Sequence, residues 1–441
     1  MKCKVFVVLS FVSISFSSQA QEKVLLENVI TVALEKNYDV LLSKNTSTTA
    51  AVDNENAFGA FLPQFNITGT ASGNNPTQVL QFKDATRNQQ GETKQQSLTA
   101  ALAMNWVLFD GTKMFATKAR IAAIASQGEL LVKDQMVNTI ATVINNYYNI
   151  VRQKQQLNAT RELMAVNEER VKLAERKLAV GIGAKPELLQ AKVDLNAQKT
   201  QVLVQETAIA VLKEQMNTLT GLSLPPNYDV ADTIVINLNL TQDEISENIE
   251  QSNFSLLSSK WNIVIAEKSL HERKAGLAPT ISVNGNYGYS KTNNTILLNP
   301  FGTIYFQSSG LSAYGANITI PVFNSLNNRR LIQQGKVTLD RQKLLFTQQK
   351  VTVDMNIKNV FINYENSKKV LLIEEENILL ARENVNIALE SFKRGVSTFI
   401  ELRTAQQSLA DAYNRLITAR FNAKVSETEL LRLKGTLLTQ K

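Results

Sequence analysis

Apolar residues recur every seven positions toward the ends of two long stretches of the chain, residues 112–180 and 324–394, and the same spacing resumes beyond the glycine that follows each stretch. Neither stretch contains a proline, and each contains one glycine, Gly128 in the first and Gly335 in the second. At about 1.5 Å per residue, each stretch predicts a helix of about 100 Å. A period of seven sustained over this length predicts a left-handed coiled coil, whereas a helix packed on a globular core would drift out of that register. The heptad positions are Leu157, Met164, Val171, Leu178, Leu188, Leu195, Val202, Ile209 and Met216 in the first half, and Leu371, Ile378, Val385, Phe392, Leu402, Leu409, Leu416, Ala423 and Leu430 in the second.

Four further segments alternate apolar residues with small or polar ones. Segments of about ten residues with one apolar and one polar face are typical of membrane-barrel strands. The alternative is a pair of soluble hairpins with one buried face, but export of the chain and aromatic residues at the strand ends favour the membrane. Polar loops at residues 74–95 and 293–310 are expected to connect the strands of each pair. The expected strands cover about residues 61–73, 96–109, 278–292 and 311–323.

The amino terminus, residues 1–20, has the pattern of a secretory signal peptide. A short basic start precedes an apolar run, and Ser18-Gln19-Ala20 supplies the small residues of a cleavage site. We expect the mature chain to begin near Gln21. A lipoprotein would need a cysteine at the cleavage point, but the only cysteine is Cys3, so we expect neither an acyl anchor nor a disulfide. No later stretch is apolar for long enough to form a transmembrane helix, so any membrane-spanning part must consist of strands.

The charge balance and the histidine content limit which ligands and reactions we expect for this chain. The chain has 47 lysines and arginines against 39 aspartates and glutamates, and two of the lysines lie in the signal peptide, which leaves a surplus of six positive charges. This surplus is spread along the sequence, so we expect no nucleic-acid partner. The only histidine, His271, lies in a charged helical stretch and is expected to be a solvated surface residue. One histidine weighs against His-based triads and His-ligated metals, so we expect no enzyme, no metal site and no cofactor.

The two halves of the mature chain share one plan. Gly181, with Glu187-Leu188 after it, recurs as Gly395, with Glu401-Leu402 after it, an offset of 214 residues. The sequence therefore predicts two structural repeats, each ending in a helical hairpin. The expected parts are a first repeat over residues 21–222 with its hairpin tip at 180–187, a linker over 223–245, and a second repeat over 246–441 with its tip at 394–401.

Four strands are too few to close a barrel, and an open sheet edge in lipid would leave backbone groups without hydrogen-bond partners. The barrel must therefore be shared among copies of the chain, and three copies would supply twelve antiparallel strands around a water-filled lumen. The expected fold is a mixed α and β membrane protein with an internal two-fold repeat. Its trimeric 12-stranded β-barrel, four strands per protomer, continues as a long periplasmic α-helical coiled-coil barrel.

Four motifs occur in order within this duplicated plan: Trp106-Val-Leu-Phe-Asp-Gly111, the turn from Ala179 to Leu188, Ile320-Pro-Val-Phe-Asn324, and the turn from Arg394 to Leu402. With them, about residues 24–437 resemble the TolC-like outer membrane efflux protein family. The resemblance implies a homotrimer in outer-membrane lipid of a Gram-negative bacterium, docked to a periplasmic adaptor (a membrane fusion protein) and an inner-membrane pump of RND, ABC or MFS type. The implied function is the exit duct of a tripartite efflux or type I secretion system. The alternatives are a standalone porin and a periplasmic coiled-coil scaffold. Whether drugs, metals or polypeptides pass is left open, because the pump selects the cargo.

In this family the hairpin tips meet the adaptor and close the periplasmic entrance. The expected docking residues are Val180, Gly181, Ile182, Gly183, Gly395, Val396 and Phe399, of which the apolar side chains are expected to be exposed, although they could instead pack tip against tip in the trimer. The gate candidates are Glu187, Glu401, Thr404, Phe392 and Arg394. Helix capping is the alternative role of both glutamates. Because Phe392 and Ser397 replace the tyrosine and arginine of the family's closing lock, we expect different locking bonds, with Lys393 or Arg394 as candidates.

Overall fold

The computed structural model describes residues 22–225, 228–296 and 303–438, and it divides into two compact units. Unit 1 comprises Met1–Leu41, Gln135–Glu247 and Met355–Lys441. Unit 2 comprises Leu42–Asp134 and Asn248–Asp354. Within the described ranges, none of the helices combines the length and the apolar character needed to cross a bilayer.

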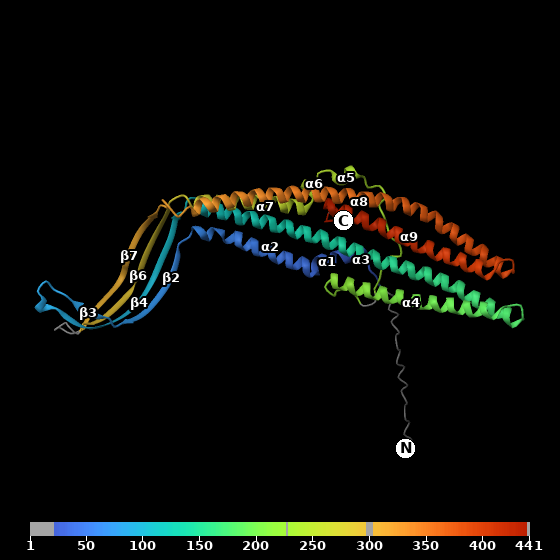
Figure 1. Cartoon of the computed structure of the whole chain (residues 1–441), viewed down its shortest axis with the longest axis horizontal. Coiled ribbons are helices and arrows are strands. Elements are labelled where there is room, and N and C mark those ends of the chain that lie inside the picture. Colours follow the sequence, from blue (N-terminus) through green and yellow to red (C-terminus); the bar gives the residue numbers. More distant parts are fainter. Residues whose placement is uncertain (1–21, 226–227, 297–302, 439–441) are drawn as a thin grey trace, which may run out of the picture. The chain divides into compact units, whose positions relative to one another are not determined.

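Unit 2 contains an antiparallel sheet in the order β2-β4-β6-β7 (Figure 1). The four strands are β2 (Gln64–Asn74), β4 (Gln89–Phe109), β6 (Thr280–Ile296) and β7 (Thr303–Thr319). A short fifth strand, β3 (Thr77–Leu80), pairs with the beginning of β4, and the single turn η2 (Ala85–Arg87) lies between them. The strands of the two halves meet where β4 pairs with β6, so β2 and β7 form the two outer edges.

The register gives the sheet one apolar and one polar face. Ile67 lies opposite Leu102, which lies opposite Tyr287 on its other side, and cross-strand partners share a face. The opposite face is polar: the hydroxyls of Thr99 and Ser290 lie 3.3 Å apart, and Asn317 Nδ2 donates to Asn284 Oδ1 at 2.9 Å. In the single chain the large apolar residues of the first face are exposed. They are Phe65, Ile67, Leu98, Leu102, Trp106, Tyr287, Tyr314 and Ile318.

The expectation of long polar loops between the strands is wrong. Residues 89–95 belong to β4, residues 77–80 form β3, and β6 and β7 continue to Ile296 and from Thr303, while residues 297–302 lie outside the described part. Backbone pairing needs no apolar side chain, so Gln, Thr and Asn continue the ladder where the sequence pattern indicates a loop. The opposite error occurs at Phe61, which belongs to the short helix η1 (Ala57–Phe61) and not to β2. At the far end β7 stops before Pro321, which has no N–H to donate.

The remaining elements of unit 2 are the helices that lead into and out of the sheet strands. α2 (Tyr38–Asn56) lies against the beginning of α3 (Lys113–Ala179), and α7 (Phe254–Ala275) lies against the beginning of α8 (Asn327–Lys393), with the short α6 (Ile249–Ser252) ahead of α7. The single glycine of each long helix marks these contacts. A Cβ on Gly128 would lie 3.2 Å from Ser47 Oγ of α2, and one on Gly335 would lie 2.9 Å from Leu270 Cδ1 of α7.

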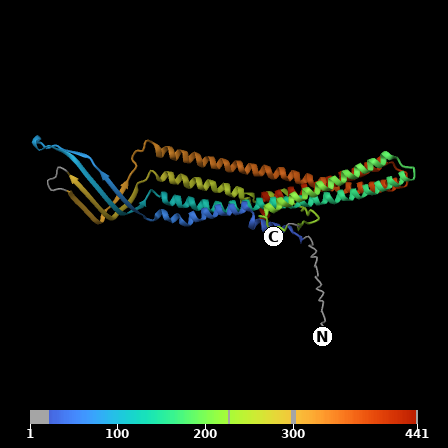
Figure 2. The same cartoon turned by 90° about the horizontal axis from the view of Figure 1, so that it is seen from below.

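Unit 1 contains α3 from Gln135 onward with α4 (Lys185–Leu219), and α8 from Met355 onward with α9 (Phe399–Lys434). The turns of these two helical hairpins lie at the same end (Figures 1 and 2). Both α3 and α8 have 67 residues, and their first residues are 214 positions apart. The turns before them also agree, because Gly111-Thr112 and Ser325-Leu326 all have positive φ. Unit 1 also contains α1 (Leu26–Lys36), α5 (Gln242–Ser246) and the terminal turn η3 (Thr436–Leu438).

The heptad seam is fully buried in α9. Its five expected positions, from Leu402 to Leu430, are all buried, and α9 packs between α3 and α8. One core cluster joins the three helices, with Leu163 from α3, Val385 from α8 and Leu409 from α9. The corresponding positions of α4 are half-buried, apart from the buried Met216. A single chain therefore buries the seam of α9 and leaves the seam of α4 partly exposed.

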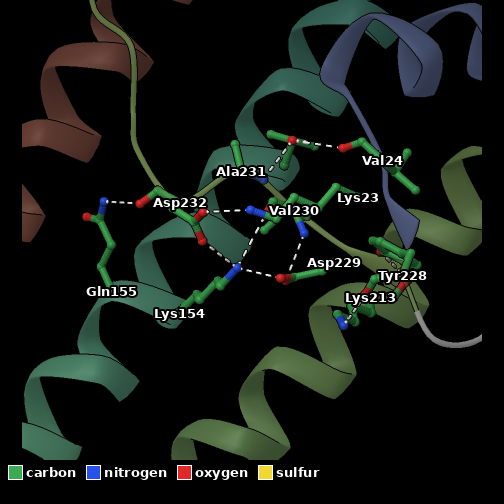
Figure 3. A network of polar contacts seen from close by, with 11 residues as sticks. Lys23, Val24, Lys154, Gln155, Lys213, Tyr228, Asp229, Val230, Ala231 and Asp232 are labelled. Atoms are coloured by element: carbon green, nitrogen blue, oxygen red, sulfur yellow. Dashed lines mark hydrogen bonds and ion pairs between the residues drawn. The ribbon is translucent and has the colours of Figure 1, made fainter. Parts of the chain in front are cut away.

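The linker between the halves is held by a polar cluster around Lys154 of α3 (Figure 3). Lys154 Nζ lies 2.6 Å from Asp229 Oδ2 and 2.7 Å from Asp232 Oδ1. Strand β5 (Tyr228–Asp229) pairs in parallel with β1 (Glu22–Lys23), and Lys23 Nζ adds a second cation 2.9 Å from Asp232 Oδ2. Further along, Tyr364 of α8 donates to the Asn237 carbonyl at 2.7 Å, and Glu427 of α9 accepts from the Asn237 N–H at 3.0 Å. The linker thus ties both hairpins together.

Folding also gathers positive charge, so the expectation that the surplus is dispersed is wrong for unit 2. The beginning of α3, the end of α7 and the beginning of α8 touch: Arg120 pairs with Glu272 at 2.8 Å, and Arg273 Nη1 donates to the Leu331 carbonyl at 3.0 Å. Residues 110–120, 267–274 and 327–336 together hold nine lysines and arginines against three aspartates and glutamates. Each segment alone is modestly basic, and only their contact makes a patch.

We predict that the Lys154 cluster weakens in acid. The hydrogen bonds from Lys154, then from Lys23, lower the pKa of Asp232 to about 2. A lowered carboxyl pKa stabilises the fold above its unfolded value, about 3.9, and this contribution disappears as the pH falls through about 2. The unfolding temperature of Asp232→Asn should therefore lie below wild type at pH 7, and the difference should shrink toward zero near pH 2. Asp340→Asn, the same charge change at an exposed position of α8 with no ion pair among the described residues, is the control. An equal, pH-independent loss in both variants would contradict the prediction.

Candidate functional site at the ends of the helical hairpins

Each hairpin turns at a glycine in the left-handed region. Gly181 has φ 83° and Gly395 has φ 77°. The next residue closes each helix end in the same way: Ile182 N–H donates to the Lys177 carbonyl, and Val396 N–H donates to the Ser391 carbonyl, both at 3.0 Å. This is the pattern in which a glycine ends a helix at lowest cost. A Cβ would meet nothing within 4 Å at either glycine, so backbone conformation alone selects the residue there.

Three of the four apolar tip residues are exposed. Val180 is 70% exposed, Ile182 77% and Val396 82%. The expectation that Phe399 is exposed is wrong, because its ring packs 6.5 Å from the Phe392 ring and is partly buried. Ile400, which the sequence pattern did not single out, is exposed instead. A helix places successive residues about 100° apart, so a shift of one position exchanges the inner and outer residues of the turn.

Phe392 lies inside the tip. It is almost fully buried, and Lys177 Nζ of α3 lies 4.0 Å from the centre of its ring. This contact joins the end of α8 to the end of α3. Neither expected lock residue has a side-chain contact of this kind: Lys393 pairs with Glu390 of its own helix at 2.8 Å, and Arg394 is exposed, with no ion pair among the described residues.

Glu401 acts as a helix cap in this structure. Its Oε2 accepts from the Thr398 N–H at 3.1 Å, and its own N–H donates to Thr398 Oγ1 at 3.3 Å, which forms a capping box at the start of α9. Thr404 Oγ1 donates to the Ile400 carbonyl of the same helix at 2.9 Å. Glu187 lies in the first turn of α4, where the helix dipole favours an acid. One of its carboxylate oxygens is buried without a hydrogen bond to any described residue.

A buried polar link joins the two hairpins at Arg170 of α3, whose side chain is only 1% exposed. Arg170 Nη2 lies 2.5 Å from Asp194 Oδ2 of α4, and Nη1 donates to Gln406 Oε1 of α9 at 2.7 Å. The Phe399 ring centre lies 4.8 Å from the guanidinium carbon. Arg403 of α9 adds a second cation 3.2 Å from Asp194 Oδ2. Burial lowers the pKa of the Arg170 guanidinium, and the bond to Asp194 opposes that shift.

A second polar link lies further from the tip. Tyr413 of α9 donates to Glu162 Oε2 of α3 at 2.6 Å, and Arg382 of α8 donates to the Tyr413 hydroxyl. Sequence reasoning found neither link. The usable signal was position: Arg170 and Asp194 each precede a heptad residue, and Arg403 follows one. Charges that flank a seam on three helices can meet only if the helices are in the right axial alignment, which a single sequence does not reveal.

Comparison with known proteins agrees with this fold. The family model described as outer membrane efflux protein matches residues 33–222 and 245–436. The chain is 23% identical to outer membrane protein TolC of Vibrio cholerae, over 86% of this chain and 84% of that protein. It is 20% identical to the alkaline protease secretion protein AprF of Pseudomonas aeruginosa, over 77% of this chain and 70% of that protein. Among solved structures it resembles CusC (TM-score 0.74, 14% identity, 93% of this chain and 91% of that one) and Vibrio cholerae VceC (TM-score 0.71, 16% identity, 93% and 96%).

A sheet with one apolar face and long helical hairpins define an outer-membrane channel protein. The chain belongs to the outer membrane efflux protein family, since the family model matches both halves, and the resemblance found in the sequence is thereby confirmed. Its location is the outer membrane of a Gram-negative bacterium. No group of three or more potential metal-ligating side chains (His, Cys, Asp or Glu) is found within residues 22–225, 228–296 and 303–438.

We predict that Arg170→Met loosens the hairpin ends. The change removes the bond to Gln406 of α9 and leaves Asp194 with Arg403 as its only cation, which should lower the free energy of unfolding by about 1–3 kcal/mol. Spin labels at the exposed Val180 and Val396 should report a broader distance distribution. The control is Arg161→Met, which breaks the exposed pair with Glu206 (2.7 Å) within the first hairpin and should cost less than about 1 kcal/mol. Equal broadening in both variants would show that Arg170 does not hold the hairpins together.

Proposed function

We propose that three copies of the chain form a continuous exit duct through the outer membrane and into the periplasm. The observation that carries the proposal is the sheet, which exposes a row of large apolar residues on one face and has unpaired outer edges at β2 and β7 within the described residues. In lipid, the apolar face is stable, but each backbone group without a partner costs several kcal/mol. Pairing β7 of one copy with β2 of the next removes both edges.

The strand directions support this closure. Neighbouring strands alternate along β2-β4-β6-β7, so the two outer strands run in opposite directions. An edge of one copy therefore meets the edge of the next as an antiparallel pair, and the ring closes without a mismatch. Three copies give twelve strands, a size at which a water-filled lumen fits, and the ladder of Ser, Thr and Asn then lines it.

The helices support the same assembly. In the single chain α9 is covered by α3 and α8, whereas α4 and α8 each expose a row of large apolar residues. These are Leu189, Val193, Leu203, Val204 and Val211 of α4, and Leu372, Ile373, Leu379, Leu380 and Ile387 of α8. Apolar rows of this length are covered in a stable protein. If α8 of one copy lies against α4 of the next, the helices close into a tube below the barrel, as an internal two-fold repeat allows.

The proposed role is the last component of a tripartite efflux or type I secretion system. The exposed Val180, Ile182, Val396 and Ile400 would dock a periplasmic adaptor, which joins the duct to an inner-membrane pump of RND, ABC or MFS type. Among the relatives, one is named for toluene efflux and another for secretion of a protease, which fits a duct whose pump selects the cargo. A porin would have no use for helices of 67 residues, and a periplasmic scaffold would have no use for an apolar sheet face.

We further propose that Glu187 and Glu401 form acidic rings at the periplasmic entrance, with Thr404, Phe392 and Arg394 beside them. Three copies would place six carboxylates near one axis, and a cation held among them would relieve their mutual repulsion. Glu401 serves as a cap at the same time, since capping uses one carboxylate oxygen and leaves the other open. The unpartnered buried oxygen of Glu187 favours a ligand or a neighbouring copy at that position.

The test is conductance in a planar bilayer. We expect wild-type channels to conduct and to be blocked by divalent or trivalent cations added on the periplasmic side. The Glu187→Ala/Glu401→Ala variant should conduct with at least tenfold weaker block, because the charges that hold the cation are gone. Thr398→Ala is the matched control: it removes the capping box at a cost of about 1 kcal/mol and keeps both charges, so block should be unchanged.

The outcomes separate the proposals. Wild-type protein that inserts and gives no conductance would contradict the duct. Conductance with block unaltered in the double variant would contradict the acidic rings and leave both glutamates as helix caps.

A further inference from the structure

A groove with a volume of about 710 Å³ lies in unit 2, where the sheet meets the helices. One wall is the beginning of α3, with Phe115, and the other is the end of α7, with Lys268, His271 and Lys274. The groove ends where the turn after β4 presses on the turn before β6. A Cβ on Gly111 would lie 2.5 Å from the Ala275 carbonyl oxygen and 2.4 Å from Ala278 Cβ, so the backbones are in close contact there.

The two lysines of the groove, Lys268 and Lys274, take part in no ion pair among the described residues. Glu272, which lies between them in the sequence, is already bound to Arg120 at 2.8 Å. Asp110, at the edge of the groove, accepts the Met114 N–H at 3.0 Å as a helix cap. The groove therefore combines two unpaired lysines on its α7 wall with an aromatic side chain, Phe115, on its α3 wall.

Aromatic contacts join this groove to the apolar face of the sheet. Trp106, on that face, donates its indole N–H to the Phe61 carbonyl at 2.8 Å. The Phe61 ring lies 5.0 Å from the Phe115 ring in an edge contact, and Phe115 lines the groove and is exposed. Aromatic residues at the end of an apolar sheet face mark the level of the lipid headgroups. Cations immediately beyond them lie at the depth of the headgroup phosphates.

The fold does not require these cations. Pro63 and Pro279 hold equivalent places before β2 and β6 and are 216 residues apart, and counting back by 216 from Lys268, His271 and Lys274 gives Val52, Glu55 and Phe58. At the equivalent positions of the first half the chain carries an apolar, an acidic and an aromatic residue. The helix that leads into each pair of strands therefore does not need basic residues at these positions, and a ligand for the basic residues of α7 explains them better than packing does.

We infer that the groove binds the phosphate headgroup of an anionic phospholipid in the periplasmic leaflet of the outer membrane. Lys268 and Lys274 supply charge, His271 supplies an N–H donor, and Phe115 and Leu277 contact the first carbons of the acyl chains. The inference rests on the proposed function for the side of the membrane on which the helices lie. A lipid bound in the groove would hold the helical end of the sheet at a fixed depth in the membrane.

The test is native mass spectrometry of the purified full-length protein in nonionic detergent, titrated with phosphatidylglycerol, with phosphatidylcholine, or with inorganic phosphate. We expect wild type to retain phosphatidylglycerol in preference to phosphatidylcholine. Lys268→Gln/Lys274→Gln should weaken phosphatidylglycerol retention about tenfold or more, since the headgroup phosphate loses both of its cationic partners. His271→Gln should weaken it less. The matched control is Lys358→Gln/Lys369→Gln, which removes the same charge from two exposed positions of α8 outside the groove and should change nothing.

Equal retention of phosphatidylglycerol in wild type, groove variant and control would overturn the inference. Equal retention of phosphatidylcholine would reduce the site to apolar contact, and displacement of the lipid by millimolar inorganic phosphate would make it a small-anion site; either result also overturns it. Bilayer conductance separates this inference from the duct. A protein that conducts without groove-dependent lipid retention counts against the groove alone, and one that retains the lipid without conducting counts against the duct alone.

Discussion

Backbone hydrogen bonding along the outer strands is the constraint on which the rest of this structure depends. β2 has 11 residues and β7 has 17, and among the described residues each is paired on one side only. In water such edges are solvated, but in a bilayer they have no substitute partner. The apolar face of the sheet is stable in lipid, whereas the unpaired edges of a single copy are costly there. The proposed duct meets both demands together, because copies of the chain pair edge to edge in it.

The same logic extends along the helices in a weaker form. Helices with coiled-coil seams tolerate partial exposure in water. In the single chain, α4 and α8 leave rows of apolar residues exposed. Packing of these rows against a neighbouring copy would remove the free-energy cost of that exposure. Within the chain the seam of α9 is buried, and two polar links across the hairpins fix the axial alignment of the helices. The Arg170 link consists of a few hydrogen bonds and ion pairs on top of a long apolar contact. In the proposed duct, breaking this link alone would free the tips and leave the apolar contact intact.

Sequence reasoning succeeded where a period or a backbone conformation leaves a direct mark. The heptads located the α9 seam, and Gly181 and Gly395 located the turns because positive φ selects glycine. It failed where the decision lies in contacts between distant segments. The polar ends of β4, β6 and β7 pair through backbone groups that the side-chain pattern does not report, and Phe399 differs from Ile400 by only one position on a turn. Arg170, Asp194 and Gln406 come together only through axial alignment of three helices, and the basic groove needs two segments about 160 residues apart in the sequence to meet.

The central claim is the pairing of β7 with β2 of another copy, and a cysteine crosslink tests it most directly. Asn66, near the start of β2, and Asn317, near the end of β7, both lie on the polar face and toward the helical end of their strands. In the mature chain, which is expected to contain no other cysteine, the Asn66→Cys/Asn317→Cys variant should form disulfides between copies in the membrane. On a non-reducing gel this account expects dimers and trimers, with trimers the largest species, and neither single variant should give trimers. A protein that inserts into the outer membrane and stays a monomer under the same oxidation, across neighbouring positions of both strands, would contradict it.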